Sequence, residues 1–191
     1  MSKYISIVAV TLFLLVGTMA SAGEVEVLGV KFPEEKVIAG KTLKLNGVSY
    51  RKALGFIKVY AVGFYLEHPS KNGQEVIDSD QVKHLDFHYL TDKATAEKLQ
   101  EGFLKAMTKC NPPELVAKHK DEIETYKSYL DKDMAPGLTS TSTYVPGEGL
   151  TLVYQGQEKG TFTDPEFIQM YYRYNFGEKA NAKIRDGLLG L

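Results

Sequence analysis

Arg51 and Tyr60 are the residues whose types and spacing best suit chemistry. Arg51 stands at a turn that leads into the most apolar strand-like stretch, Gly55 to Leu66, and Tyr60 lies within it. A guanidinium offers fork-like N–H donors to a carboxylate, and a phenol adds an O–H donor. Apolar walls would enclose the rest of a ligand. The pattern indicates a site for a carboxylate or phenolate that carries an apolar body. The alternative is a surface arginine beside an ordinary core strand.

The apolar stretch predicts a central strand covered on both faces, because it is rich in aromatic and β-branched residues. Alternate side chains of a strand share a face. The face that would carry the site therefore holds Phe56, Lys58, Tyr60, Val62 and Phe64. Of these, Phe56, Lys58 and Phe64 are predicted as wall or rim residues.

His84, Asp86 and His88 form a second candidate, since their spacing of two places them on one face of a strand. Two imidazoles and a carboxylate can bind a transition metal. A flat strand face rarely brings three ligands together, so we interpret the trio as a polar strand face. We predict no metal and no cofactor.

Other function classes find little support. There is no Gly-x-Ser-x-Gly and no glycine-rich phosphate loop, and His119 lies on a helical apolar stripe, which predicts a packing residue. The single cysteine, Cys110, excludes an intramolecular disulfide and is expected to be buried. With 23 Lys and Arg against 24 Asp and Glu, the charge gives no reason to expect nucleic acid as a partner.

Residues 1–22 have the features of a secretory signal peptide: Lys3, a short apolar run and a small-residue ending at Ala22. The run is shorter than the roughly 20 residues of a membrane span. We therefore expect cleavage after Ala22, a periplasmic or secreted protein and no membrane span after signal removal. An uncleaved anchor is the alternative.

The mature chain, residues 23–191, contains no linker-like or repetitive segment and is predicted to be one domain. Strands are expected over 25–33, 41–53 with an Asn46-Gly47 turn signal, 55–66 and 82–90, followed by a meander over 138–162. Helices are expected over 94–107, from Pro112 to Leu130 with Asn111 as N-cap, from Pro165 to about Gly177, and over 180–188. This order predicts an α+β domain with helices packed on an antiparallel sheet.

The chain resembles the chalcone isomerase family, in particular its bacterial secreted branch. The resemblance begins at Gly29-Val-Lys-Phe-Pro33, continues through Arg51 and Phe56-Ile-Lys-Val-Tyr60, and extends to Lys159-Gly-Thr-Phe-Thr-Asp-Pro165 and Leu188-Leu-Gly-Leu191. It implies an open-faced β-sandwich, a large antiparallel sheet with a helical layer on one side.

Plant enzymes of this family add a phenolate to an enone with an Arg, a strand Thr, a helical Tyr and Asn, and a late hydroxyl. Arg51 matches the arginine, Tyr60 falls at the threonine position, and the late hydroxyl falls near Tyr174. The expected helix over 94–107 contains neither Tyr nor Asn. Only one catalytic position is thus retained.

A tyrosine on this strand is similar to the fatty-acid-binding members of the superfamily. The resemblance implies an exported protein that binds a small hydrophobic acid, fatty or aromatic, through Arg51 and Tyr60. The alternative is an intramolecular lyase acting on a flavonoid-like molecule, with Arg51 stabilising an anion and Tyr60 donating a proton. A third reading is a scaffold whose cleft is filled by tyrosines: Tyr60, Tyr171, Tyr172 and Tyr174.

Overall fold

The computed structural model describes residues 23–191, so the predicted signal peptide lies outside the described residues. Seven antiparallel strands pair in sequence order as one sheet: β3 (Glu35–Ile38), β4 (Lys41–Ala53), β5 (Ile57–Leu66), β6 (Lys83–Tyr89), β7 (Thr139–Val145), β8 (Gly149–Tyr154) and β9 (Gln157–Phe162). A separate hairpin contains β1 (Glu24–Val27) and β2 (Val30–Pro33). The predicted strand at 25–33 is therefore two strands.

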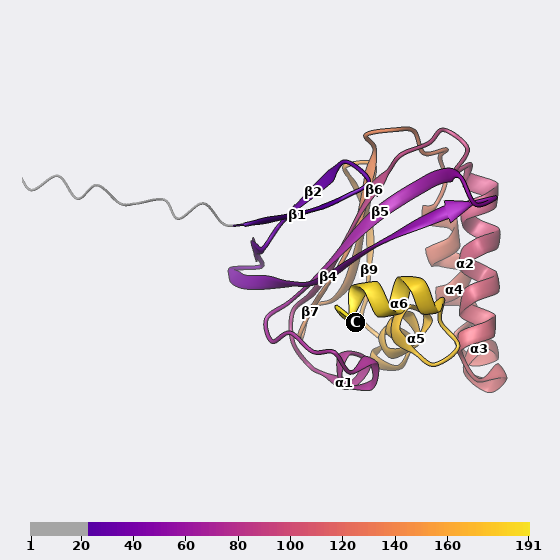
Figure 1. Ribbon diagram of the computed structural model, residues 1–191. Coiled ribbons are helices and arrows are strands. Elements are labelled where there is room, and N and C mark those ends of the chain that lie inside the picture. Colours follow the sequence, from indigo (N-terminus) through magenta and orange to yellow (C-terminus); the bar gives the residue numbers. More distant parts are fainter. Residues whose placement is uncertain (1–22) are drawn as a thin grey trace, which may run out of the picture.

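Within residues 23–191, six helices accompany the sheet: α1 (Gly73–Asp78), α2 (Ala96–Cys110), α3 (Pro113–Lys118), α4 (Lys120–Tyr129), α5 (Pro165–Phe176) and α6 (Ala182–Leu188). Figure 1 shows a curled sheet with α2, α5 and α6 against one face and the β1–β2 hairpin on the other side. Phe32 of that hairpin packs where a Cβ at Gly63 would otherwise lie. The expected α+β open-faced sandwich is confirmed. No helix in residues 23–191 is both long and apolar enough to cross a membrane.

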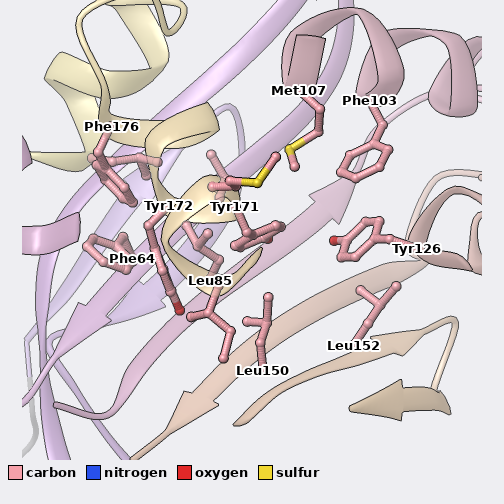
Figure 2. Packing of buried hydrophobic residues seen from close by; sticks show 14 of the residues in the cluster. Phe64, Leu85, Phe103, Met107, Tyr126, Leu150, Leu152, Tyr171, Tyr172 and Phe176 are labelled. Carbon is pink, nitrogen blue, oxygen red and sulfur yellow. The ribbon is translucent and has the colours of Figure 1, made fainter. Parts of the chain in front are cut away.

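Helix α5 is the centre of the core. Asp164 caps its first turn, as the sequence predicted, by accepting from the N–H groups of Glu166 and Phe167. Its inner face, including Tyr171, Tyr172 and Phe176, is buried (Figure 2). These rings meet apolar side chains of the sheet, among them Phe64 and Leu85. This packing holds α5 in place against the sheet and so fixes the positions of its remaining side chains.

The helix predicted from Pro112 to Leu130 is wrong in one respect, because the backbone breaks at His119 and gives α3 and α4. The predicted cap is also wrong: Pro112 occupies the N-cap position. Asn111 instead donates to the carbonyls of Met107 and Met170 and accepts from Arg173. Its amide is thus used to join α2 to α5. Cys110 is a buried free thiol, as expected.

Asn46-Gly47 is not a turn. Strand β4 runs through it with a β-bulge, as the pairing steps from Leu45–Tyr65 to Gly47–Phe64. The side chain of Asn46 donates to the carbonyls of Ser70 and Leu188, and Gly47 lies against the backbone of α6. The dipeptide therefore attaches the C-terminal helix to the sheet. Two short elements, β3 and α1, were not predicted from the sequence.

Candidate functional site

Arg51 and Tyr60 are direct cross-strand partners in β4 and β5. They lie on the helical face, because Ser49 and Gly47, two and four residues before Arg51, contact α6. Arg51 is exposed and Tyr60 is half-buried. Burial raises the pKa of Tyr60, and the charge and hydrogen bonding of Arg51 offset this only in part. At neutral pH the pair therefore presents a cation beside a protonated phenol, which is a hydrogen-bond donor.

Aromatic side chains from three elements surround this pair. The Tyr60 ring makes edge contacts with Phe87 and Tyr89 on β6, at centroid distances of 5.3 and 5.8 Å. Tyr174, half-buried on α5, lies 6.0 Å from Phe103 of α2 and adds a second phenol within electrostatic reach of Tyr60 and Arg51. Burial holds the pKa of Tyr174 well above its usual range. The surroundings of the pair are thus apolar, with neutral hydroxyls.

The space behind the pair is filled. Phe103 and Tyr126 stack at 4.4 Å, and Tyr126 lies 5.5 Å from Tyr171, as Figure 2 shows. The hydroxyl of Tyr171 is bonded to Ser142 at 2.6 Å. A ligand held by Arg51 would therefore lie over Tyr60 and Tyr174 rather than deep between the sheet and the helices.

The other three predicted site residues lie elsewhere. Phe64 is fully buried against Phe176 in the core, at a centroid distance of 4.6 Å. Phe56 precedes β5 and is 75% exposed in the turn. Lys58 pairs with Lys52, because Val59 is an extra residue between this pair and Arg51–Tyr60. This bulge puts Lys58 on the face opposite Tyr60, so the predicted shared face is wrong.

Tyr89 was not predicted to belong to the site. The alternation of residues 82–90 identified its strand, but only the β5–β6 register places Tyr89 opposite Tyr60. A hollow of about 530 Å³ lies in a different region, between α1, the end of α5 and α6. Its lining includes Asn72, Ile77, Phe176, Arg185 and Leu189.

The polar face of β6 is bonded within the protein. Asp86 accepts from Lys36, and its other oxygen lies 3.1 Å from Nε2 of His88. Burial opposes ionisation, but the hydrogen bonds from His88 and Lys36 lower the pKa of Asp86 to about 2. His84 contacts the Thr143 hydroxyl at 2.8 Å, and burial lowers its pKa to about 4. Asp86, Lys36 and His88 therefore form an internal polar network, and Phe32 of the β1–β2 hairpin packs on His88 at a centroid distance of 5.3 Å.

His119 joins two helical segments, which confirms its predicted packing role. Its ring is 2% exposed, with Nε2 2.6 Å from Oε2 of Glu166 and Nδ1 3.3 Å from Oε1 of Glu122. Asp164 also lies close, so that His119, Glu122 and Asp164 bring possible metal ligands within 4.8 Å of one another. Burial lowers the pKa of His119, but the hydrogen bonds to Glu166 and Glu122 outweigh it and raise the pKa.

Replacing His119 by Gln is expected to destabilise the protein by about 1–3 kcal/mol at low pH, since charge-assisted hydrogen bonds are lost. A raised folded-state pKa favours folding fully below the ordinary value of 6.5, and this advantage disappears as the pH rises through the folded pKa. Urea unfolding of both proteins from acidic to alkaline pH measures the difference. A difference that grows with pH would contradict this charge assignment.

Comparisons with known proteins agree with this architecture. The family described as chalcone isomerase-like matches residues 24–190. A search of curated protein sequences returned no match. Among solved structures, a fatty-acid binding protein of Arabidopsis thaliana is similar, with a TM-score of 0.68 and 16% sequence identity. The alignment covers 87% of this chain and 96% of that chain, which at this identity shows a common fold. Because the family match spans nearly all of the described residues, the chain belongs to the chalcone isomerase-like family.

Proposed function

We propose that this protein binds a small hydrophobic acid, fatty or aromatic, at Arg51 and Tyr60. The observation that carries the proposal is the cross-strand pairing of an exposed guanidinium with a half-buried phenol on the helical face. The shared fold with a fatty-acid binding protein supports the same chemistry. In this proposal the mature chain is exported, after cleavage behind Ala22, to the periplasm or out of the cell.

Each part of the ligand has a matching partner at this site. The carboxylate accepts hydrogen bonds from the N–H groups of Arg51 and from the O–H of Tyr60. The Tyr60 phenol stays protonated because its pKa is raised. The apolar body lies on the rings of Tyr60 and Tyr174, whose faces and edges exclude water. The raised phenol pKa values also keep negative charge away from the bound anion.

The lyase alternative gains no specific support. Helix α2, which the family resemblance matches to the plant helix that carries Tyr and Asn, contains neither tyrosine nor asparagine between Ala96 and Cys110. Proton transfer would then depend on Tyr60 alone, whose raised pKa makes it a poor acid near neutral pH. Binding without turnover is the simpler use of these residues.

Calorimetric titration with decanoate and cinnamate tests the proposal, with Arg51→Gln as the decisive variant. We expect Arg51→Gln to weaken binding about tenfold or more, since one charge-assisted contact is lost. Tyr60→Phe keeps the ring and is expected to weaken binding severalfold. Lys52→Gln, at the next residue on the opposite face, is the matched control and should bind normally.

Four further results separate the proposed site from its alternatives. Decanol lacks the anion, so the wild type and Arg51→Gln should bind it equally weakly. Equal decanoate affinity in the wild type and Arg51→Gln would refute the proposed site. Binding of neither acid would support the closed scaffold instead, and cyclisation of an added chalcone would support the lyase.

A further inference from the structure

The β4–β5 hairpin extends beyond the rest of the sheet. Its two strands pair as far as Ala53–Ile57, whereas the pairing of β5 with β6 reaches only Tyr60–Tyr89. On the other side, β3 pairs with β4 only up to Lys44. Within residues 23–191, no further strand flanks the last rungs of this hairpin. Its tip is thus a two-stranded projection, located next to the proposed acid site.

The tip presents two large apolar side chains to solvent. Leu54 is 80% exposed and Phe56 is 75% exposed, on either side of Gly55. Leu54 also has a φ of +50°, a conformation that asparagine and glycine adopt far more readily than leucine. Asparagine in place of Leu54 would reduce the backbone strain at this φ and would remove apolar surface from contact with water. The apolar residues at this turn therefore need a role outside the folding of the hairpin itself.

The charge around the tip has one sign. The projecting part of the hairpin and its base, residues 45–66, contain no Asp or Glu but three basic residues: Arg51, Lys52 and Lys58. Lys183 of α6 joins them, since its ammonium and that of Lys52 lie 3.7 and 5.6 Å from the Tyr50 ring centroid. The whole chain has a net charge of only −1. The hairpin is therefore a local positive region that ends in an apolar tip.

We propose that this hairpin docks on an anionic lipid surface, with Leu54 and Phe56 inserted among the headgroups and Lys52 and Lys58 near the phosphates. Shallow insertion of apolar side chains beside basic residues is sufficient for reversible binding to an anionic membrane. Two side chains cover far less than the roughly 800 Å² that each partner of a stable protein interface buries. The lipid surface therefore fits the tip better than a second copy of the chain does.

Docking would also bring the acid site to the source of its ligand. Arg51 lies three residues before Leu54, at the base of the projecting part of the hairpin. A hydrophobic acid leaving the bilayer would meet the tip first and the guanidinium next. The lipid contact does not depend on acid binding, so the two proposals can fail separately.

The chain contains no tryptophan, which allows a clean spectroscopic test. Phe56→Trp places a single tryptophan at the tip. With vesicles of phosphatidylglycerol and phosphatidylcholine, its emission should shift to the blue, and lipids brominated on the acyl chain should quench it. The matched control is Val37→Trp, because Val37 is a 72% exposed residue on β3, away from the tip. Its emission should not change.

Charge reversal tests the electrostatic part. In the Phe56→Trp protein, Lys52→Glu combined with Lys58→Glu should raise the lipid concentration needed for half-maximal shift by about tenfold or more. The proposal is overturned if vesicles leave the Phe56→Trp emission unchanged, or if both tryptophan positions respond alike. It is also overturned if the shift appears without lipid and grows with protein concentration, which would indicate a second copy as the occupant. Decanoate titration without vesicles shows separately whether the acid site is intact.

Discussion

Gly47→Ala is expected to destabilise the protein by at least about 3 kcal/mol, because the new methyl group has no space. A Cβ at residue 47 would lie 2.3 Å from the carbonyl oxygen of Gly187 and 2.7 Å from that of Leu188. Both are backbone atoms, so no side-chain rotation can relieve the overlap. Either the strand or α6 must move, and Asn46 holds the two together through Leu188.

Gly102→Ala is the matched control for this prediction. Gly102 lies within α2, and a Cβ there would meet nothing within 4 Å. Alanine favours the helix over glycine, so this variant should gain about 0.5–1 kcal/mol. Urea unfolding of both variants gives the two free energies. If Gly47→Ala unfolds like the wild type, then β4 and α6 do not pack backbone to backbone. The placement of Arg51 on the helical face, which depends on this contact, would then be wrong.

Much of the fold could be predicted because it depends on local patterns. Alternating and apolar runs identified β4 to β6, and glycine turns divided the β7–β9 meander. Asp164-Pro165 marked the start of α5, since a capping carboxylate followed by proline is a strong local signal. The family resemblance then supplied the arrangement of these elements, and the structure confirmed it.

The candidate site was only partly predictable, because two bulges decide which side chains share a face. An extra residue at Asn46 in β4 and another at Val59 in β5 each shift the alternation by one position. Neither has a distinctive side chain. Strict alternation therefore placed Lys58 beside Tyr60, whereas the bulge moves it to the opposite face and leaves Arg51 as the partner of Tyr60.

Long-range contacts account for the remaining differences. The break at His119 goes with a hydrogen bond to Glu166, 47 residues away, which no helical periodicity can indicate. Tyr89 joins the site through strand register, and Phe64 leaves it because Phe176 of the distant α5 covers it. Local sequence thus predicts the elements, while distant partners determine which of their residues remain available to a ligand.

His84 is expected to make the protein sensitive to mild acid. Its folded-state pKa is about 4, whereas its ordinary value is 6.5, so the unfolded chain takes up the proton first as the pH falls. Stability is therefore lost between pH 6.5 and 4, by about 3 kcal/mol at 1.36 kcal/mol for each pKa unit. Below pH 4 this residue causes no further loss. The physical cause is burial of the ring, which lies between Tyr65 of β5 and Thr143 of β7.

His84→Asn should remove this loss of stability, because asparagine can still form a hydrogen bond with Thr143 but does not titrate. Urea unfolding at successive pH values should then give a flatter profile between pH 6.5 and 4 than in the wild type. A second loss of stability should remain in both proteins as the pH falls from 3.8 to 2. The Asp86 carboxyl, whose pKa is lowered, stabilises the fold only while it is ionised. The exposed His68 provides the control, and His68→Asn should follow the wild-type profile. An unchanged slope in His84→Asn would mean that protonation at another residue limits acid stability, and that His84 is more accessible to water than its packing indicates.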